Sequence, residues 1–383
     1  MLKPTAIICE YNPFHCGHEH QINETKRQLN VSHTVAVMSS NFVQRGDAAL
    51  FTKSVRATAA LACGVDLVLE LPAAPSLSSA ENFAFGGVAI AEALNVCNIL
   101  SFGSECGDTA RLTALAHETQ LDRSAIDSGA PYHAAVSPPG NPLSPNDILA
   151  AEYIRALRKA GSNIVPHAVL RVGTGHDADT AGEGFASASL IRSMILGGRF
   201  AEAMAFVPSC AAEIYAGAPC ADISRLSSAI LHSLRVKTAN EIGSFAGMSE
   251  GIENRIHAAA KTAGSFSELC AAVKTKRYPM SRVRRSVLYA ALEITLEELY
   301  TPPQYIRVLG LNEKGQELLK KAKDKCLLPI VHSLKEAENL SKKAASQARL
   351  EARLGAAYGG CFEKILPADA EYTAPIIFSK KQF

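Results

Sequence analysis

Tryptophan is absent from this chain of 383 residues, and aromatic residues make up only 6% of it. Long apolar runs are absent too. The run before Glu10 is too short for a secretion signal, and no segment approaches the 18 or more residues of a membrane-spanning helix. The ten cysteines include no Cys-X-X-Cys pair, which argues against a structural zinc site or a disulfide framework. We therefore expect a cytoplasmic protein with reduced thiols, no membrane contact and no metal-ligating residues.

A net charge of one sign is nearly absent as well, because 39 Lys and Arg residues oppose 37 Asp and Glu residues for a formal charge of +2. The two halves differ, however. Residues 1–200 carry a net charge of −4 and residues 201–383 carry +6. The positive charge is concentrated at the end of the chain, since residues 251–383 carry +8. A hydrophobic content of 48% excludes a disordered chain, and the length allows two or three domains. The unequal charge of the halves indicates two regions with different tasks.

Short apolar runs alternate with helical segments in the first half, which is typical of a doubly wound parallel sheet. The predicted strands cover residues 6–9, 34–38, 66–71, 98–102 and 163–170, and the predicted helices cover 18–29, 53–63, 79–94, 148–159 and 188–195. After residue 200 the pattern is helical, apart from a strand–helix–strand element at 305–309, 313–325 and 327–331. We therefore predict an α/β fold, with a Rossmann-like domain at 1–200 and a mainly α-helical C-terminal domain at 201–383.

Residues suited to phosphate chemistry follow the first predicted strand, where His15 and His18 flank Gly17 at the start of a helix. Free N–H groups at a helix N-terminus attract phosphate, glycine lets a ligand approach the backbone, and imidazoles can hold phosphate oxygens. Two other interpretations stay open: a surface pair that caps the helix, or a metal site with Glu19 and His20. Neither a Gly-X-Gly-X-X-Gly motif nor a P-loop motif is present, so those two routes to phosphate are excluded.

A second candidate phosphate clamp lies far downstream. Ser187, Ser189 and Arg192 place two hydroxyls and a guanidinium at the start of a predicted helix. Taken alone, this pattern fits a simple N-cap followed by a surface arginine equally well. Together with His15 and His18, it favours a phosphate site built from both elements.

This combination resembles the HxGH nucleotidyltransferase superfamily, whose members bind ATP between these two elements and displace pyrophosphate at the α-phosphate. More specifically, the sequence resembles the tRNA(Met) cytidine acetate ligase family. The resemblance runs from residue 6 to about residue 330, and a weaker similarity is found in the C-terminal segment EYTAPII (371–377). It rests on seven blocks in order: EYNPFHCGH, SSNFVQRGDAALFTK, DLVLELP, FGSE, SPNDIL, FASASLIR and YIRVLGLNEKG. The sequence departs from the family pattern at two places. Cys16 stands where the family has a polar residue, and the segment Ser39–Ser40–Asn41 has a serine where the family has a glycine.

The resemblance implies a ligase that uses ATP and Mg²⁺ to activate acetate as acetyl-adenylate, and then acetylates the wobble cytidine of elongator tRNA(Met) to N4-acetylcytidine. Acetate is already a nucleophile, so the first step needs alignment and charge cancellation rather than a general base. Two alternatives stay open: a small-molecule nucleotidyltransferase, and a non-catalytic RNA-binding protein on a transferase fold. The sequence predicts no oligomeric state.

The resemblance also implies roles for individual residues. The implied catalytic residues are His15, His18, Lys53, Ser189 and Arg192. The implied ATP-binding residues are Ile8, Glu10, Tyr11, Asn12, Pro13, Phe14, His15, Gly17, His18, Gln21, Gly103, Asn146, Arg171 and Ser187. Lys53 can alternatively be a solvated residue at a helix N-terminus, and Arg45 with Asp47 can be a structural ion pair as easily as active-site groups.

Two loops are expected near the nucleotide. Residues 121–145 are rich in Pro, Gly and Ser, and residues 172–185 hold four glycines. Long loops inside a domain often act as lids. We therefore hypothesise that residues 121–145 close over the nucleotide.

The basic second half is expected to bind the tRNA. Phosphate neutralisation by a cluster of cations gives salt-sensitive binding, and Tyr278 among them could stack on an unpaired base. The six predicted tRNA-binding residues fall within twelve positions: Lys274, Lys276, Arg277, Arg282, Arg284 and Arg285. The other interpretation is a solvated basic helix face. A second candidate strip comprises Lys314, Lys320, Lys321, Lys323 and Lys325.

Overall fold

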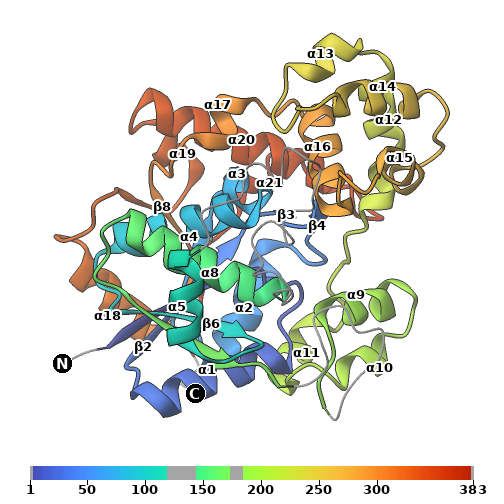
Figure 1. Cartoon of the computed structure of the whole chain (residues 1–383). Helices are drawn as coiled ribbons and strands as arrows, with labels where there is room; N and C mark the ends of the chain where they lie inside the picture. Colours follow the sequence, from blue (N-terminus) through green and yellow to red (C-terminus); the bar gives the residue numbers. More distant parts are fainter. Residues whose placement is uncertain (1–2, 119–143, 173–183, 381–383) are drawn as a thin grey trace.

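A mostly parallel, eight-stranded sheet lies at the centre of the computed structural model, which describes residues 3–118, 144–172 and 184–380 (Figure 1). Its strands are β1 (Pro4–Cys9), β2 (His33–Ser39), β5 (Leu67–Leu71), β6 (Ile99–Ser104), β7 (Val165–Leu170), β8 (Ile306–Leu311), β9 (Ile330–Val331) and β10 (Ile377–Phe378). The order is β10-β8-β5-β2-β1-β6-β7, and β9 pairs with β8. The predicted α/β fold is confirmed.

Strand β1 lies where the sheet changes its direction of growth. From β1 the chain adds β2 and β5 on one side and later β6 and β7 on the other, all in parallel. In such sheets the carboxyl ends of the strands on either side of this switch point border a crevice that binds ligands. The histidine motif follows the carboxyl end of β1 directly.

Alternate residues of β1 enter two different hydrophobic cores because side chains of a strand point alternately to its two faces. Ala6 and Ile8 belong to one core and Ile7 and Cys9 to the other, so residues 6–9 are all apolar, as is typical of a parallel sheet buried on both faces. The first core is covered by α4 (Ala80–Leu94), α5 (Thr109–Glu118), α8 (Pro145–Lys159) and α18 (Glu313–Ala322). The second is covered by α1 (Cys16–Leu29), α2 (Lys53–Ala62), α9 (Ala188–Leu196), α10 (Phe200–Met204) and α11 (Ser209–Tyr215).

The segment between residues 200 and 300 is helical throughout, as predicted, and its later part forms a separate group at the upper right of Figure 1. This group comprises a short 3₁₀ helix (Ile223–Leu226), α12 (Ser227–Arg235), α13 (Ala239–Gly243), α14 (Ile252–Ala260), α15 (Phe266–Val273) and α16 (Met280–Ala291). Its core continues into the helices α3 (Ala73–Ser76), α17 (Leu296–Tyr300) and α20 (Lys342–Gly359). The remaining short elements are α19 (Leu334–Glu338), α21 (Ala370–Thr373) and a hairpin of β3 (Phe42–Val43) and β4 (Asp47–Ala48).

The predicted strand–helix–strand element is present as β8, α18 and β9, but its place differs from the expectation. Strand β8 joins the main sheet antiparallel to β5, with Val68 opposite Gly310, and β10 extends the sheet beyond it. All six residues of β8 are buried, which explains why this strand is not a separate module. The sheet is therefore not built from residues 1–200 alone.

Among the described residues, no helix has both the length and the apolar character needed to span a bilayer. The predicted loop at 121–145 lies outside the described ranges except for its last two residues, and most of 172–185 lies outside them too. The hypothesis that residues 121–145 form a lid therefore concerns a segment outside the described residues.

Candidate active site

His15 and His18 form a reciprocal cap at the N-terminus of α1. The Nδ1 atom of His15 accepts a hydrogen bond from the backbone N–H of Gly17 at 3.0 Å, and the Nδ1 atom of His18 accepts one from the backbone N–H of His15 at 3.3 Å. Because a backbone N–H can only donate, each neutral imidazole carries its proton on Nε2. Capping therefore uses the Nδ1 atom of each ring as the acceptor, and the proton of each neutral ring is on Nε2.

Gly17 is required by this cap. A Cβ atom at this position would lie 2.8 Å from the His15 ring, so any side chain would push the imidazole out of place. The two rings lie with centroids 3.9 Å apart. The glycine thus holds the two histidines together, in addition to opening the backbone to a ligand.

His18 is neutral at pH 7 in this arrangement. Burial lowers its pKa well below the usual histidine value, and the nearby charges of His15 and Arg171 lower it further. The ring of Tyr11 packs edge-on at a centroid distance of 4.9 Å. A neutral imidazole with an Nε2–H can donate to a phosphate oxygen without titrating near physiological pH.

A fully buried arginine that the sequence did not single out holds the loop between β1 and α1. Arg56 on α2 donates to the backbone oxygens of Glu10 and Ser40, both at 2.7 Å, and so ties the ends of β1 and β2 together. On the other side of the loop, the backbone N–H of Phe14 donates to the hydroxyl of Tyr215 at 2.9 Å. The loop is therefore positioned from two sides.

The second predicted element contacts the first. Ser187 caps α9 by accepting from the backbone N–H of Leu190, and Arg192 donates to the backbone oxygen of Asn12 at 2.8 Å and to the hydroxyl of Ser189 at 3.2 Å. The guanidinium thus joins α9 to the histidine loop. Neither Ser189 nor Arg192 lines the cavity that His15 and His18 line.

That cavity, of about 170 Å³, lies at the switch point of the sheet, in front of both helix N-termini. Most of the predicted ATP-binding residues line it: Ile8, Glu10, Tyr11, Asn12, His15, His18, Gln21, Gly103, Asn146, Arg171 and Ser187. Gly17 lines a smaller adjoining cavity, which shares His15 and Arg171 with the first. Pro13 and Phe14 line neither; Phe14 packs instead against the rings of Tyr11 and His18.

Several lining residues are not among the predicted ATP-binding residues. The hairpin loop contributes polar side chains, and α4, β6 and α8 contribute an apolar wall; these residues are Gln44, Arg45, Phe83, Phe102, Leu149 and Tyr153. Arg45 is thus placed at the cavity, while Asp47 pairs with Arg284 at 2.9 Å. An apolar wall facing polar donors suits a nucleoside joined to phosphates.

Two lining side chains carry buried donors without a partner among the described residues, the Nδ2 of Asn12 and the Nε2 of Gln21. A buried donor of this kind costs free energy unless a ligand or water accepts from it. On the opposite side, Glu105 accepts from the Nδ2 of Asn146 at 2.5 Å and lies 3.5 Å from the Nε of Arg171. Glu105, another residue missed in the sequence, therefore fixes two predicted ligand contacts.

Lys53 departs from its predicted place. Its ammonium is buried and lies 2.6 Å from Glu371, in contact with Glu70, and Arg307 completes the cluster at 2.9 Å from Glu371. It lines a different cavity, of about 340 Å³, which it shares with Arg307 and Glu371. The alternative of a solvated residue is therefore wrong, because the buried carboxylates hold this ammonium inside the molecule. The catalytic role that the resemblance implies stays a prediction, and Lys53 does not line the ATP cavity.

All four arginines predicted to contact tRNA, and the tyrosine among them, are also engaged within the chain. Arg284 donates to the backbone oxygen of Gly46 at 2.9 Å, and Arg285 donates to that of Gln44 at 2.7 Å. Arg282 lies 3.1 Å from Glu250, and the Tyr278 ring is only 4% exposed, which excludes stacking on a base. Arg284 and Arg285 instead anchor the hairpin loop that brings Gln44 and Arg45 to the cavity.

A Rossmann-like sheet with paired histidines and two helix N-termini at its switch point defines a nucleotidyl transferase. Residues 2–370 match the model of the HIGH Nucleotidyl Transferase family. The tRNA(Met) cytidine acetate ligase of Acetivibrio thermocellus is 34% identical over 88% of this chain and 89% of its own length, and that of Thermoanaerobacter sp. is 36% identical over 85% and 87%. The chain belongs to this family, the tRNA(Met) cytidine acetate ligases within the HIGH nucleotidyl transferases.

Solved structures agree with this assignment. The crystal structure of Thermotoga maritima TmcAL bound with alpha-thio ATP shares 30% sequence identity, covers 99% of this chain and 100% of its own, and superposes with a TM-score of 0.88. The apo form of the same protein superposes with a TM-score of 0.90. The fold is thus shared over the full length of both chains.

Proposed function

We propose that this chain activates acetate with ATP and transfers the acetyl group to the wobble cytidine of elongator tRNA(Met), giving N4-acetylcytidine. The observation that carries the proposal is the pair of imidazoles at the N-terminus of α1, His15 and His18, which line a cavity at the switch point of the sheet. The family assignment supplies the reaction. The compartment that we expect is the cytoplasm, where its thiols stay reduced.

In the first step, a carboxylate oxygen of acetate forms a bond to the α-phosphorus of ATP, and the bond from that phosphorus to the bridging oxygen breaks. Pyrophosphate leaves with the electron pair. The reaction needs charge cancellation on the phosphates, for which His15, His18 and the helix N-termini provide donors and Arg171 and Arg45 provide positive charge. The unpartnered amides of Asn12 and Gln21 add two donors.

In the second step, the exocyclic amine of cytosine attacks the acyl carbon of acetyl-adenylate, AMP leaves, and the amine loses one proton. The amine is a weak nucleophile, so positioning of the base contributes most of the rate. None of the described residues that line the cavity is a free carboxylate base: Glu10 is the one acid among them, and its backbone-bonded side chain has a pKa raised by burial. We propose no protein base for this step.

Magnesium binding depends on the acidic side chains at the cavity. Within residues 3–118, 144–172 and 184–380, no group of three or more His, Cys, Asp or Glu side chains is arranged to hold a metal ion. With Glu10 as the one described acid at the cavity, the residues do not form an Mg²⁺ site of their own. We propose that Mg²⁺ enters on the triphosphate of ATP, and we assign it no protein ligand.

Lys274, Lys276 and Arg277 remain the tRNA contacts that we propose from the basic segment. All three are exposed on the surface of the helical group, next to the C-terminus of α15. Arg277 also lies 2.9 Å from Glu250, so the two lysines are the stronger candidates. Exposed cations of this kind neutralise phosphates without reading sequence.

The proposal is tested by incubating the purified chain with labelled acetate, ATP, Mg²⁺ and elongator tRNA(Met). Label should enter the RNA, and should not enter a transcript in which uridine replaces the wobble cytidine. His18→Ala should abolish acetate-dependent exchange of pyrophosphate into ATP while tRNA binding persists. Exchange without transfer would refute the proposed RNA substrate, and activity of the His18→Ala variant would refute the proposed phosphate site.

A further inference from the structure

A second, larger cavity lies back to back with the ATP cavity. Its volume is about 550 Å³, and helices α4 and α8 form walls of both. On α4, Phe83 lines the ATP cavity and Phe85 lines the second one. On α8, Tyr153 lines the ATP cavity and Arg155 lines the second one. The opposite wall of the second cavity comes from α17 and the residues after it, so we name it the α4–α8–α17 groove.

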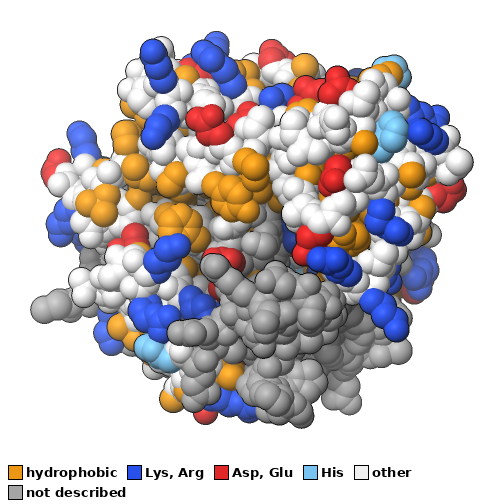
Figure 2. Space-filling model, turned by 45° about the horizontal axis from the view of Figure 1, so that its top comes forward, with side chains coloured by type: hydrophobic (Ala, Val, Ile, Leu, Met, Phe, Trp, Pro, Cys, Tyr) orange, Lys and Arg blue, Asp and Glu red, His pale blue; other side chains and the backbone are white. Residues whose placement is uncertain are grey.

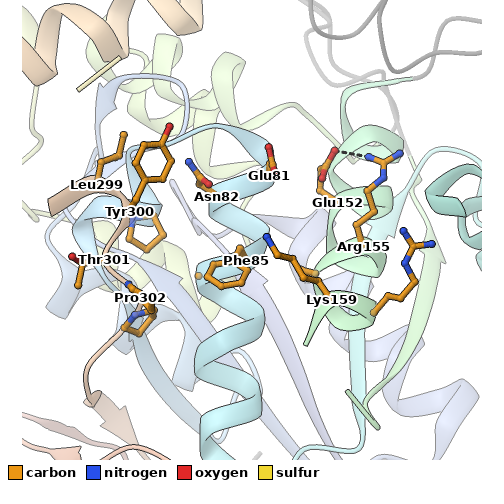
Figure 3. Close-up of a pocket in the computed structure, with 15 residues that line it drawn as sticks. Glu81, Asn82, Phe85, Glu152, Arg155, Lys159, Leu299, Tyr300, Thr301 and Pro302 are labelled. Atoms are coloured by element: carbon orange, nitrogen blue, oxygen red, sulfur yellow. Dashed lines mark hydrogen bonds and ion pairs between the residues drawn. The ribbon is translucent and has the colours of Figure 1, made fainter. Parts of the chain in front are cut away.

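The groove combines exposed aromatic rings with cations. Figure 3 shows Tyr300 and Pro302 on one side, Phe85 on α4 between them and α8, and Lys159 reaching from α8 toward Phe85. Tyr300 is 61% exposed and Phe85 is 37% exposed, although large aromatic side chains are normally buried. The Lys159 ammonium lies 5.4 Å from the centroid of the Phe85 ring.

The charges of the groove are unevenly placed. Arg155 is neutralised by Glu152 at 2.5 Å, and Glu81 is the remaining lining acid. Lys159 and Arg158, both on α8, are exposed; Arg158 has no acidic partner among the described contacts and lies 2.7 Å from the Nδ1 atom of His117. Hydrophobic side chains gather near the middle of the face drawn in Figure 2, and both basic and acidic side chains lie around them. A ring platform with cations beside it fits a base joined to a phosphate.

We infer that the α4–α8–α17 groove binds an unpaired nucleotide of the substrate tRNA, with the base against Tyr300 and Phe85 and the adjoining phosphates on Lys159 and Arg158. This inference rests on the proposed function and adds a second RNA contact to it. Single-stranded RNA is recognised in this way, because every nucleotide has a base that can stack on an aromatic ring and a phosphate that attracts a cation. The shared helices place this contact next to the ATP cavity.

The test measures the affinity of the full chain for elongator tRNA(Met) by filter binding over a series of salt concentrations. Tyr300→Ala should weaken binding about tenfold, as removal of one base stack does, and Tyr300→Phe should keep the wild-type affinity because it keeps the ring. Lys159→Ala should lower the slope of log affinity against log salt by about 0.7, since it neutralises one phosphate fewer. Leu296→Ala on α17 and Lys335→Ala on α19, both exposed and outside the groove, are the matched controls.

Acetate-dependent exchange of pyrophosphate into ATP separates this inference from the proposed function, because that step needs no RNA. Each groove variant should keep wild-type exchange. Wild-type tRNA affinity in Tyr300→Ala would overturn the groove assignment, while failure of the wild-type chain to acetylate tRNA would instead overturn the proposed function. A photo-crosslinking residue at position 300 should capture the tRNA; capture of a second copy of the chain would show that the groove is a protein interface and would overturn the inference.

Discussion

Arg192 donates a hydrogen bond of 2.8 Å to the backbone oxygen of Asn12, from the first turns of α9 to the loop that carries the histidine motif. The same guanidinium reaches the hydroxyl of Ser189 at 3.2 Å. Two elements separated by 180 residues of sequence are thus held in one geometry. The arginine positions the loop, and the amide of Asn12 is then aimed at the cavity.

Replacement of Arg192 by lysine should therefore impair the first chemical step. Lysine keeps the charge but cannot bridge both acceptors with a rigid fork. We expect kcat/KM for acetate-dependent pyrophosphate exchange to fall about 10- to 100-fold, the usual effect of removing a charge-assisted hydrogen bond of about 1.5–3 kcal/mol. Arg199→Lys, at an exposed ion pair with Glu202, is the control and should be neutral. An unchanged Arg192→Lys enzyme would show that the bond to Asn12 is dispensable.

Arg285 should affect ATP rather than tRNA. Its hydrogen bond to the backbone oxygen of Gln44 holds the hairpin loop at the ATP cavity, so Arg285→Ala should raise KM for ATP severalfold in the exchange assay. The affinity for tRNA should change by less than twofold. Arg282→Ala removes a neighbouring interaction with Glu250 and should leave KM for ATP unchanged. A tRNA defect in Arg285→Ala without an ATP defect would instead make Arg285 a tRNA contact.

The sequence predicts the place of the histidine pair, at the start of α1, because its determinants are local. A strand, a motif and a helix start lie within a few residues, and the cap between His15 and His18 forms from neighbours in the chain. The N-cap at Ser187 is local in the same sense, and it occurs at the residue that the sequence predicts. What each cap faces in space is then set by the parallel sheet.

Non-local contacts explain what the sequence could not provide. The pairing of β8 with β5 joins segments more than 200 residues apart, and no local pattern distinguishes a strand that joins a distant sheet from one in a separate domain. The sequence of a basic segment does not show whether a given cation is exposed to solvent, as Lys274 is, or bound to a backbone oxygen, as Arg285 is. Phe83 and Tyr153 look like core residues of amphipathic helices, and only the packing reveals that they also face a cavity.

Lys53 provides a prediction on stability. Lys53→Met leaves the carboxylates of Glu70 and Glu371 with Arg307 as their remaining cation in a buried cluster, so the free energy of unfolding should fall by about 3–5 kcal/mol. Urea unfolding measures this change. Lys321→Met, in an exposed pair with Glu317, should cost at most about 1 kcal/mol. The folded fraction of Lys53→Met should retain pyrophosphate exchange; a stable variant without exchange would place Lys53 in catalysis after all.

His18 predicts how stability depends on pH. Because burial lowers the pKa of His18 in the folded chain, the unfolded chain binds a proton first as the pH falls below the usual histidine pKa of about 6.5. The contribution of this residue to stability is therefore present above pH 6.5 and declines as the pH falls toward the lowered pKa, by at most about 1.4 kcal/mol per pH unit. His18→Gln should lose less stability than wild type between pH 7 and pH 5. The exposed His232→Gln should follow the wild-type curve, and identical curves for all three would contradict a neutral His18.

Charge reversal at Lys274 and Lys276 tests the proposed tRNA surface in the basic segment. Both side chains are exposed, and neither lines the ATP cavity, so the double variant should fold and keep pyrophosphate exchange. Its affinity for tRNA should fall at least tenfold in about 0.1 M salt, and the slope of log affinity against log salt should decrease by about 0.7–0.9 for each phosphate that is no longer neutralised. Charge reversal of Lys320 and Lys321 on α18 changes the net charge by the same amount, so the two double variants compare the second basic strip with the first. A larger effect from that pair than from Lys274 and Lys276 would move the tRNA surface to α18, because only the strip that touches phosphates alters the salt slope.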